Sequence, residues 1–401
     1  MILPGQAWGL AAPGPDGPVF VTSYDGKNLS AAVLTALGLD GEVLWRRTFD
    51  GHPGPPRVSG NGTVWIAHRG PASGMLTELD ASGTVVREVI PEHEPFEHLG
   101  AFAVLSDGIC ASWLPAGRSR VVPPGRHARV ARHGLDGSCR WSAPAVLDQL
   151  SYPGCVEVSA ETGWQARPAR PWTPRTIKAH HWEPLLVSGH RVAATFADGR
   201  SGIAVTFFLD ADAGQPIATS TPGPSHHKAI SGPGEFLIGS QGYGAFSTSR
   251  YDDAGAVTQE WPTHAMILIG RDGRISGPES ENVLPSRSHY VSLEPDSTVR
   301  RGPALPGYYT SYPALDNDGT AVFWRDGRLR AVDRDLQARV LFTREEEKRA
   351  VISKIMLLRD GQVAFAVHDE LLILPRTGLG PLDSGIWPCA DGGLHGNPVL
   401  H

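Results

Sequence analysis

The sequence predicts an all-β protein, and three observations support this prediction. Of the 401 residues, 47 are glycine and 34 are proline without a collagen-like period, which indicates a chain with many turns. Short runs of alternating apolar and polar residues recur, and many are followed by Asp-Gly or Ala-Gly pairs, as in β-hairpins. Helical periodicity is nearly absent, because the best candidate is the short charged run at 343–356.

Two kinds of hairpin alternate along the chain. In the first kind, two largely apolar strands are joined by a turn that contains Gly, Asp or Asn. The seven first hairpins lie at residues 8–23, 52–68, 98–113, 181–196, 227–240, 311–324 and 353–367. In the second kind, two alternating strands are joined by a tighter turn. The six second hairpins lie at residues 34–47, 75–88, 128–142, 204–219, 265–279 and 328–342.

One hairpin of each kind makes a unit of four strands and about 40 residues, which is typical of a β-propeller blade. A lone four-stranded sheet cannot bury both of its faces, whereas blades packed face to face around an axis can. We therefore expect one propeller domain over residues 1–401, with seven blades, or eight as the alternative. Insertions are expected at about 146–178 and 281–307, and the second is either an extra hairpin or part of an eighth blade. We expect the segment 385–401 to supply a strand that closes the ring onto the first blade.

Two phrases carry a family resemblance: LTALGLDGEVLW, which ends at Trp45, and GLDGSCRW, which ends at Trp141. They resemble the repeats of the quinoprotein-like superfamily of propellers, which includes the pyrroloquinoline quinone dehydrogenases and the outer-membrane assembly lipoproteins. The resemblance covers most of the chain and implies the fold, but this fold hosts many activities. The dehydrogenases carry adjacent cysteines, and this chain has no Cys-Cys, so a quinone cofactor is not expected. We expect both tryptophans to pack between blades.

Composition narrows the partners and the compartment. The formal charge is −6 without a basic stripe, which argues against a nucleic-acid partner. The four widely spaced cysteines form no C-x-x-C motif, so we expect free thiols in a reducing compartment. No signal-like start and no apolar run of about 18 residues is present, which indicates a cytoplasmic protein without a membrane partner. The Asp-rich runs at 209–214 and 315–319 are expected to be turns, because neither has the downstream glutamate of a calcium loop.

Histidines mark the candidate site. Two adjacent pairs, His180–His181 and His226–His227, stand 46 positions apart. When the first hairpins are aligned, His181 falls just before the innermost strand of its blade, and His226 is offset by two residues, which is one pleat. The histidines at the equivalent positions of two earlier blades are His52 and His98. Because innermost strands line the channel of a propeller, we expect these side chains to converge at one mouth of that channel.

The same mouth gathers aromatic and polar residues, which is typical of a small-molecule site. We expect His181, His226 and Tyr312 to act as acid and base, and Lys228 or Arg250 to stabilise developing negative charge. The residues expected to bind the substrate are His52, His98, His180, Trp182, Glu183, His227, Tyr309 and Trp172.

The sequence therefore favours an enzyme that acts on a small or medium organic substrate, of the lyase, cyclase, isomerase or hydrolase type, in specialised metabolism. The insertion at 146–178 is expected to overhang the mouth as a lid. Two alternatives stay open. One transition metal could be held by His52, His98, His181 and His226. The chain could also be a docking scaffold for a protein partner, with Trp164 and Trp172 exposed on the insertion.

Overall fold

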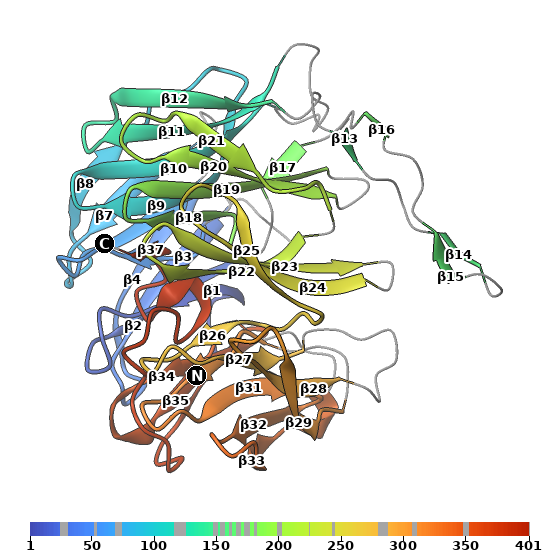
Figure 1. The fold of residues 1–401 in the computed structure, drawn as a ribbon. Helices are drawn as coiled ribbons and strands as arrows, with labels where there is room; N and C mark the ends of the chain where they lie inside the picture. The colour runs from blue at the N-terminus through green and yellow to red at the C-terminus, as the bar shows by residue number, and fades with distance from the viewer. Residues whose placement is uncertain are drawn as a thin grey trace. The chain divides into compact units, whose positions relative to one another are not determined.

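The computed structural model is built almost entirely of β-strands (Figure 1). It describes all residues except 25–30, 52–53, 69–73, 116–125, 147–150, 153–156, 160–162, 166–169, 172–176, 180–182, 199–202, 224, 243–244, 280–287, 307–310, 348–352 and 401. The described helices are short 3-10 turns at η2 (Glu345–Glu347), η3 (Arg359–Gly361) and η4 (Ala390–Gly392). None of the described helices is long and apolar enough to cross a membrane.

The chain divides into two compact units, and the first comprises residues 1–90 and 265–398. Its described strands form five antiparallel sheets, each with neighbouring strands in chain order. Residues 1–90 form two of these sheets. The first sheet contains β1 (Gln6–Ala11), β2 (Val19–Tyr24), β3 (Ala31–Leu37) and β4 (Val43–Asp50), and the second contains β5 (Arg57–Val58), β6 (Val64–His68), β7 (Met75–Leu79) and β8 (Val85–Val89). The later sheets are β26 (Leu268–Ile269), β27 (Ile275–Pro278), β28 (His289–Leu293) and β29 (Val299–Ala304), then β30 (Ala314–Leu315), β31 (Ala321–Arg325), β32 (Arg328–Val332) and β33 (Ala338–Thr343), then β34 (Met356–Leu357), β35 (Val363–Val367) and β36 (Glu370–Leu374).

The second unit comprises residues 91–264 and 399–401 and carries three larger sheets. They are β9 (His98–Leu105), β10 (Gly108–Leu114), β11 (Ala128–Gly134) and β12 (Cys139–Ala145), then β18 (Leu185–Ser188), β19 (Arg191–Asp198), β20 (Ala204–Asp210) and β21 (Pro216–Thr219) with β17 (Ile177–Ala179) and β37 (Val399–Leu400), then β22 (Ser225–Gly232), β23 (Glu235–Gly242), β24 (Ala245–Tyr251) and β25 (Val257–Trp261). The predicted insertion holds two small pairs, β13 (Ser151–Tyr152) with β16 (Arg170–Pro171) and β14 (Glu157–Ser159) with β15 (Gly163–Gln165).

The described residues thus form eight blade-type sheets, and the fold class is the predicted β-propeller. The expected count of seven was wrong and the alternative of eight is correct. Residues 265–279, predicted as a second hairpin, contain β26 and β27 and are the first hairpin of an additional blade. The second hairpin of that blade is β28–β29, within the stretch 281–307 that interrupted the repeat. The hairpin β24–β25 (245–261) was missed, and alternation around an Asp-Gly turn could not tell the two kinds of hairpin apart.

Aspartate side chains fix the turns between strands. Asp210 Oδ1 accepts backbone N–H groups from Asp212 at 3.0 Å and Ala213 at 2.8 Å. Asp316 Oδ1 accepts those of Asp318 at 3.0 Å and Thr320 at 2.7 Å. These carboxylates accept backbone N–H groups that have no strand partner in a tight turn. The Asp-rich runs are therefore turns, as expected.

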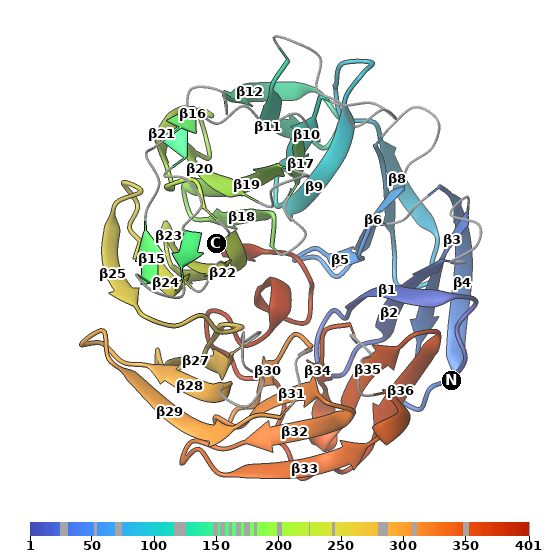
Figure 2. The same cartoon turned by 90° about the vertical axis from the view of Figure 1, so that its right-hand side faces the viewer.

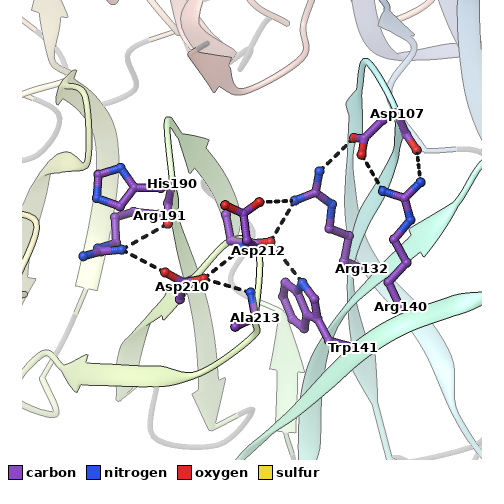
Figure 3. Close-up of polar contacts among 10 residues, drawn as sticks. Asp107, Arg132, Arg140, Trp141, His190, Arg191, Asp210, Asp212 and Ala213 are labelled. Carbon is purple, nitrogen blue, oxygen red and sulfur yellow. Dashed lines mark hydrogen bonds and ion pairs between the residues drawn. The ribbon is translucent and has the colours of Figure 1, made fainter.

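Trp45 and Trp141, on the outer strands of two sheets, each pack against a neighbouring sheet, as predicted. The indole Nε1–H of Trp45 donates to the Ala81 oxygen at 2.9 Å, and that of Trp141 donates to the Ala211 oxygen at 3.0 Å (Figure 3). A Cβ on Gly214 would lie 2.4 Å from the Trp141 ring, so this close contact requires a glycine in the turn.

Charged side chains add a second set of contacts between two sheets of the second unit (Figure 3). Arg132 of β11 donates to Asp107 at 2.8 Å on its own sheet and to Asp212 at 3.1 Å on the neighbouring sheet. Arg140 of β12 also pairs with Asp107. Because Asp212 is largely exposed, each of these pairs adds at most about 1 kcal/mol, and most of the stability comes from the buried apolar side chains.

The N-terminus completes the last blade of the first unit. Ile2 forms an antiparallel bridge with Glu370 of β36, and the Leu371 N–H donates to the Met1 oxygen at 2.9 Å. Residues 1–3 therefore take the position of a fourth strand beside β34–β36. Leu3 and Leu10 share an apolar cluster with Met356 of β34.

The C-terminal segment does not close the ring as predicted. Within the first unit it runs along the first strands of several sheets, where Trp387 bridges Ile269 of β26 and Cys389 bridges Ala314 of β30 (Figure 2). Within the second unit, β37 adds to β18 in parallel. The prediction failed because the N-terminal residues already occupy the outer edge of the last blade.

Three of the four cysteines have described side chains, and all three are free thiols, as expected: Cys110, Cys139 and Cys389. Burial raises the pKa of the Cys110 thiol to about 12 and that of Cys389 to about 11, so both are unreactive at neutral pH. Cys155 lies outside the described residues.

Candidate functional site

Four titratable side chains meet in the second unit, where β18 and β22 begin. They are Glu183, His227, Lys228 and His264, named here the Glu183 cluster. Glu183 precedes β18, His227 and Lys228 lie in β22, and His264 follows β25. Each is buried, with 5% of Glu183 and 2% of each of the other three exposed.

Side-chain hydrogen bonds to the backbone connect β18 and β22. At the far end of β18, the Ser188 hydroxyl donates to the Gly232 oxygen at 2.7 Å and accepts the Gly234 N–H at 3.0 Å. At the near end, Glu183 Oε2 accepts the Lys228 N–H at 3.2 Å and lies 3.8 Å from His227 Nδ1. Glu183 has a φ of 35°, in the left-handed region that non-glycine residues rarely adopt.

A glycine admits the fourth member of the cluster. A Cβ on Gly239 of β23 would lie 2.2 Å from His264 Cδ2, so only glycine leaves space for this ring. The His264 ring stacks on His227, with centroids 5.7 Å apart and an interplanar angle of 9°. The histidines of two different chain segments thus form one stacked pair beside Lys228.

Burial shifts the protonation of three members. It lowers the pKa of Lys228 to about 7, although the Glu183 carboxylate opposes the shift. Burial lowers the pKa values of His227 and His264 well below 6.5, and the Lys228 charge adds to both shifts. At neutral pH both imidazoles are therefore uncharged, and Lys228 is divided between ammonium and amine. An arrangement of this kind can accept, hold and return protons.

The structure brings together three of the residues that the sequence singled out, Glu183, His227 and Lys228. Of His226 only the backbone is described, in β22. The predicted residues outside the described part of the chain are His52, His180, His181, Trp182, Trp172 and Tyr309.

Three further predicted residues have described side chains and are not members of the Glu183 cluster. Arg250 is on β24, the third strand of its sheet, about 10 Å from β22 at the usual strand spacing, and its guanidinium lies 5.8 Å from the Trp261 ring. Its assignment as the group that stabilises charge beside Lys228 stays a prediction. Tyr312 belongs to the first unit, where its backbone carbonyl oxygen accepts the Ile355 N–H at 3.3 Å. His98 is half-buried at the start of β9, opposite Leu114.

His264 was missed by the sequence analysis. It lies just before the first strand of a blade. This is the kind of position for which His181 was selected in the sequence. Because 265–279 was taken for a second hairpin, this histidine seemed to lie inside a blade. A correct count of blades would have shown its position.

Among the residues with described side chains, no group of three His, Cys, Asp or Glu is arranged to hold a metal ion. Of the four histidines proposed as metal ligands, only His98 has a described side chain, so the metal hypothesis is not tested here.

A polar pocket lies in the first unit, and none of the predicted site residues is among its lining residues. Its lining includes the guanidinium groups of Arg271, Arg274 and Arg334 and the carboxylates of Asp272, Asp333 and Asp383. Arg334 pairs with Asp272, and Asp383 accepts the Arg271 N–H at 2.8 Å. The three arginines and three aspartates of this pocket balance in charge, and several of them pair with one another. We therefore regard the Glu183 cluster as the better candidate for a chemical site.

No family model matches this sequence, and no curated protein matches it. The chain is similar in structure to a eukaryotic initiation factor, with a TM-score of 0.51 at 9% identity over 94% of this chain and 92% of that one. It is similar to a puromycin hydrolase, with a TM-score of 0.50 at 14% identity over 90% of this chain, which spans 58% of that one. It is also similar to virginiamycin B lyase from Staphylococcus aureus, with a TM-score of 0.44 at 9% identity over 93% of this chain and 96% of that one. At such low identity, the similarities to the initiation factor and the puromycin hydrolase support the propeller fold alone.

Proposed function

We propose that the chain is an enzyme that transfers a proton on a small organic substrate, in a reaction of the lyase or isomerase type, at the Glu183 cluster. The observation that carries this proposal is the burial of four titratable side chains at the start of β18 and β22, with His227 stacked on His264 and 3.8 Å from Glu183. Buried groups with strongly shifted pKa values are concentrated at active sites.

The energetic argument supports the same proposal. To hold an ammonium at neutral pH where its pKa is about 7 costs on the order of 4 kcal/mol of stability. Apolar side chains of similar volume would remove that cost. A protein with an ordinary stability of about 5–15 kcal/mol retains so costly a group when the group has a use.

Each member of the cluster has a distinct role in the proposal. The uncharged His227 and His264 rings accept the substrate proton and return it. The Lys228 ammonium stabilises the negative charge that develops on the substrate. Glu183 orients its neighbours, because it accepts the backbone N–H of Lys228 and faces the His227 ring. It is also the most exposed member, so we expect the substrate to approach from its side.

Solvent-deuterium exchange tests this proposal without knowledge of the natural substrate. The purified chain is incubated in D₂O with small ketones, 2-oxo acids and esters, and the loss of C–H signals is followed by proton NMR. We expect His227→Gln to lower the exchange rate by about 10²–10⁴-fold, because an imidazole that transfers the proton contributes that much. The matched control is His190→Gln, an exposed histidine of the same unit whose Nε2 lies 4.0 Å from Asp253. Equal rates for the chain and for His227→Gln with every compound would contradict the proposal.

A docking scaffold is the second candidate, and exposed apolar side chains favour it. Leu44 of β4 and Val86 of β8 are 53% and 52% exposed on the outer strands of two neighbouring sheets in the first unit. Leu44→Asp together with Val86→Asp should abolish binding of a partner and leave deuterium exchange unchanged. Cross-linking of the chain to partners in a lysate, with and without these substitutions, checks this expectation.

A further inference from the structure

We propose that the polar pocket of the first unit binds a small zwitterion, a molecule with one carboxylate and one ammonium group, such as an α-amino acid. The inference goes beyond the proposed function, because it assigns a binding site in addition to the Glu183 cluster. All residues that line this pocket belong to the first unit, whereas the Glu183 cluster belongs to the second. The volume of the pocket is about 400 Å³ when the solvent at its open mouth is included.

The pocket lies where two neighbouring sheets meet the C-terminal segment. Arg271 and Arg274 lie between β26 and β27 of one sheet. Asn317 lies between β30 and β31 of the next sheet, and Asp383 lies in the C-terminal segment. Apolar side chains of both sheets pack in one buried cluster, so the two turns are held in a fixed relation to each other.

Two arginines of the pocket have donors without an acceptor. Arg274 Nε donates to the Ser292 hydroxyl at 3.3 Å, and Nη1 donates to the Arg334 carbonyl oxygen at 3.0 Å. The buried Nη2 of Arg274 and the exposed guanidinium of Arg271 have no hydrogen-bond partner in the described part of the chain. A buried donor that lacks an acceptor destabilises the protein, and a carboxylate oxygen would satisfy it. Guanidinium groups bind carboxylates through paired N–H donors, so these arginines fit the carboxylate of the ligand.

A buried aspartate supplies the opposite charge. Asp383 is 5% exposed, and its Oδ1 accepts the N–H groups of Arg271 at 2.8 Å and Gly385 at 2.6 Å. Among the described residues, no side-chain cation pairs with this carboxylate. Buried carboxylates are ordinarily paired with a cation. The ammonium group of the ligand would be that cation.

Asn317 provides a second acceptor on the same face as Asp383. Its buried Oδ1 has no hydrogen-bond partner within the described ranges of the sequence. Asp316 forms an antiparallel bridge with Leu382, and the Asn317 N–H donates to the Pro381 oxygen at 2.9 Å. Because side chains alternate between the two faces of paired strands, Asn317 and Asp383 lie on the same face. An ammonium group has three donors and can therefore bond to both acceptors.

The remaining charges of the pocket have partners in the protein. Arg334 pairs with Asp272, and Asp333 Oδ1 accepts the N–H groups of Asp335 at 3.0 Å and Gln337 at 2.8 Å. The three arginines and three aspartates of the lining cancel in formal charge. A ligand with a net charge therefore gains little long-range attraction from the pocket, whereas a zwitterion has a partner for each of its ends.

Isothermal titration calorimetry of the full chain tests the inference with three matched probes. L-Alanine carries both charged groups, propionate lacks the ammonium group, and ethylamine lacks the carboxylate. The open mouth of the pocket leaves room for the methyl group of alanine. We expect L-alanine to bind with a Kd between about 10 µM and 1 mM, and each of the others to bind at least about tenfold more weakly, because it loses one set of charge-assisted hydrogen bonds. Absence of binding by L-alanine at about 20 mM, or equal binding of L-alanine and propionate, overturns the inference.

Two variants test whether L-alanine binds in this pocket. Arg274→Gln should raise the Kd about 10–100-fold, because it removes a charged donor. Arg271→Gln should raise the Kd at least about threefold, and it removes no contact that supports the fold, because the exposed guanidinium bonds to no described residue. The matched control is Arg300→Gln in the same unit, whose side chain is 52% exposed and lies 3.5 Å from Glu294. If both variants bind L-alanine as tightly as the control does, the inference is overturned.

Discussion

The Glu183 cluster of the second unit and a carboxylate cluster of the first unit share one local arrangement. Glu183 Oε2 accepts the Lys228 N–H at 3.2 Å and lies 3.8 Å from His227 Nδ1. Glu279 Oε2 accepts the His289 N–H at 2.6 Å and lies 3.9 Å from His289 Nδ1. In both, a glutamate holds a strand backbone and faces an imidazole.

The two clusters differ in the cation. In the Glu279 cluster, which comprises Glu279, His289 and Arg325, the guanidinium of Arg325 is fully buried. It donates to the backbone carbonyl oxygens of Glu279 at 2.6 Å and Pro306 at 3.0 Å. Burial lowers the pKa of Arg325 to about 10, so it stays charged at neutral pH. The pKa of Lys228 falls to about 7. The same carboxylate and imidazole thus form a structural network beside arginine, and beside lysine they form the site that we propose transfers protons.

The largest expected effect concerns the pH dependence of stability. Between pH 7 and 10.5 the unfolded chain keeps a proton on Lys228 that the native chain has lost, so stability rises with pH across this window. Below pH 7 both states are protonated, and the full cost is present. We expect Lys228→Met to remove a rise of about 4 kcal/mol, measured by urea unfolding at pH 7 and at pH 10. Curves for the two proteins that stay parallel would show that the lysine is not the titrating group.

Loss of the structural cation should destabilise the protein by about 3 kcal/mol. Arg325→Met leaves the Glu279 and Pro306 oxygens without this donor and the Glu279 carboxylate without its cation. Urea unfolding at pH 7 measures the change, and Arg359→Met, which removes an exposed arginine 3.5 Å from Asp16, is the control with an expected effect below about 0.5 kcal/mol. If Arg325→Met is as harmless as its control, the distinction between the two clusters is wrong.

The stacked histidines should make the protein sensitive to acid. Because their pKa values lie well below 6.5, the unfolded chain takes up protons below pH 6.5 before the native chain does, and stability falls as the pH falls. We expect His264→Gln to lose less stability than the parent chain does when the pH falls from 7 to 4.5, because the variant lacks one of the two imidazoles. Thermal unfolding at both pH values tests this, with the exposed His190→Gln expected to behave like the parent.

The smallest expected effect on stability concerns Gly239, the glycine that leaves space for the His264 ring. Gly239→Ala places a Cβ where His264 Cδ2 lies, at 2.2 Å, so the ring must move away from His227. We expect about 1–2 kcal/mol of destabilisation and a lower deuterium-exchange rate. Gly223→Ala, whose Cβ would meet nothing closer than 3.9 Å, serves as the matched control in the same unit. Exchange that survives Gly239→Ala unchanged would remove His264 from the proposed mechanism.

Local chemistry allowed much of the fold to be predicted. Alternating strands, Asp-rich turns such as the one at Asp210, and the outer-strand Trp45 and Trp141 are all short-range features. The blade count failed because the hairpin at 265–279 has the same alternation as a hairpin of the other kind. Which position it takes in a blade depends on the strands that pair with it, and its partner β28 begins eleven positions after the end of β27.

The sequence by itself determined the all-β class, the repeated four-strand unit and the presence of Glu183, His227 and Lys228 near the start of two first strands. Only the tertiary structure decided that His264 joins them, because Gly239 makes space for a ring from the segment that leads to the next blade. It also decided the charge of Lys228, since the pKa of a lysine follows from its burial and its neighbours. Alternation fixes which face of a strand is apolar, but desolvation depends on every segment that packs around the side chain.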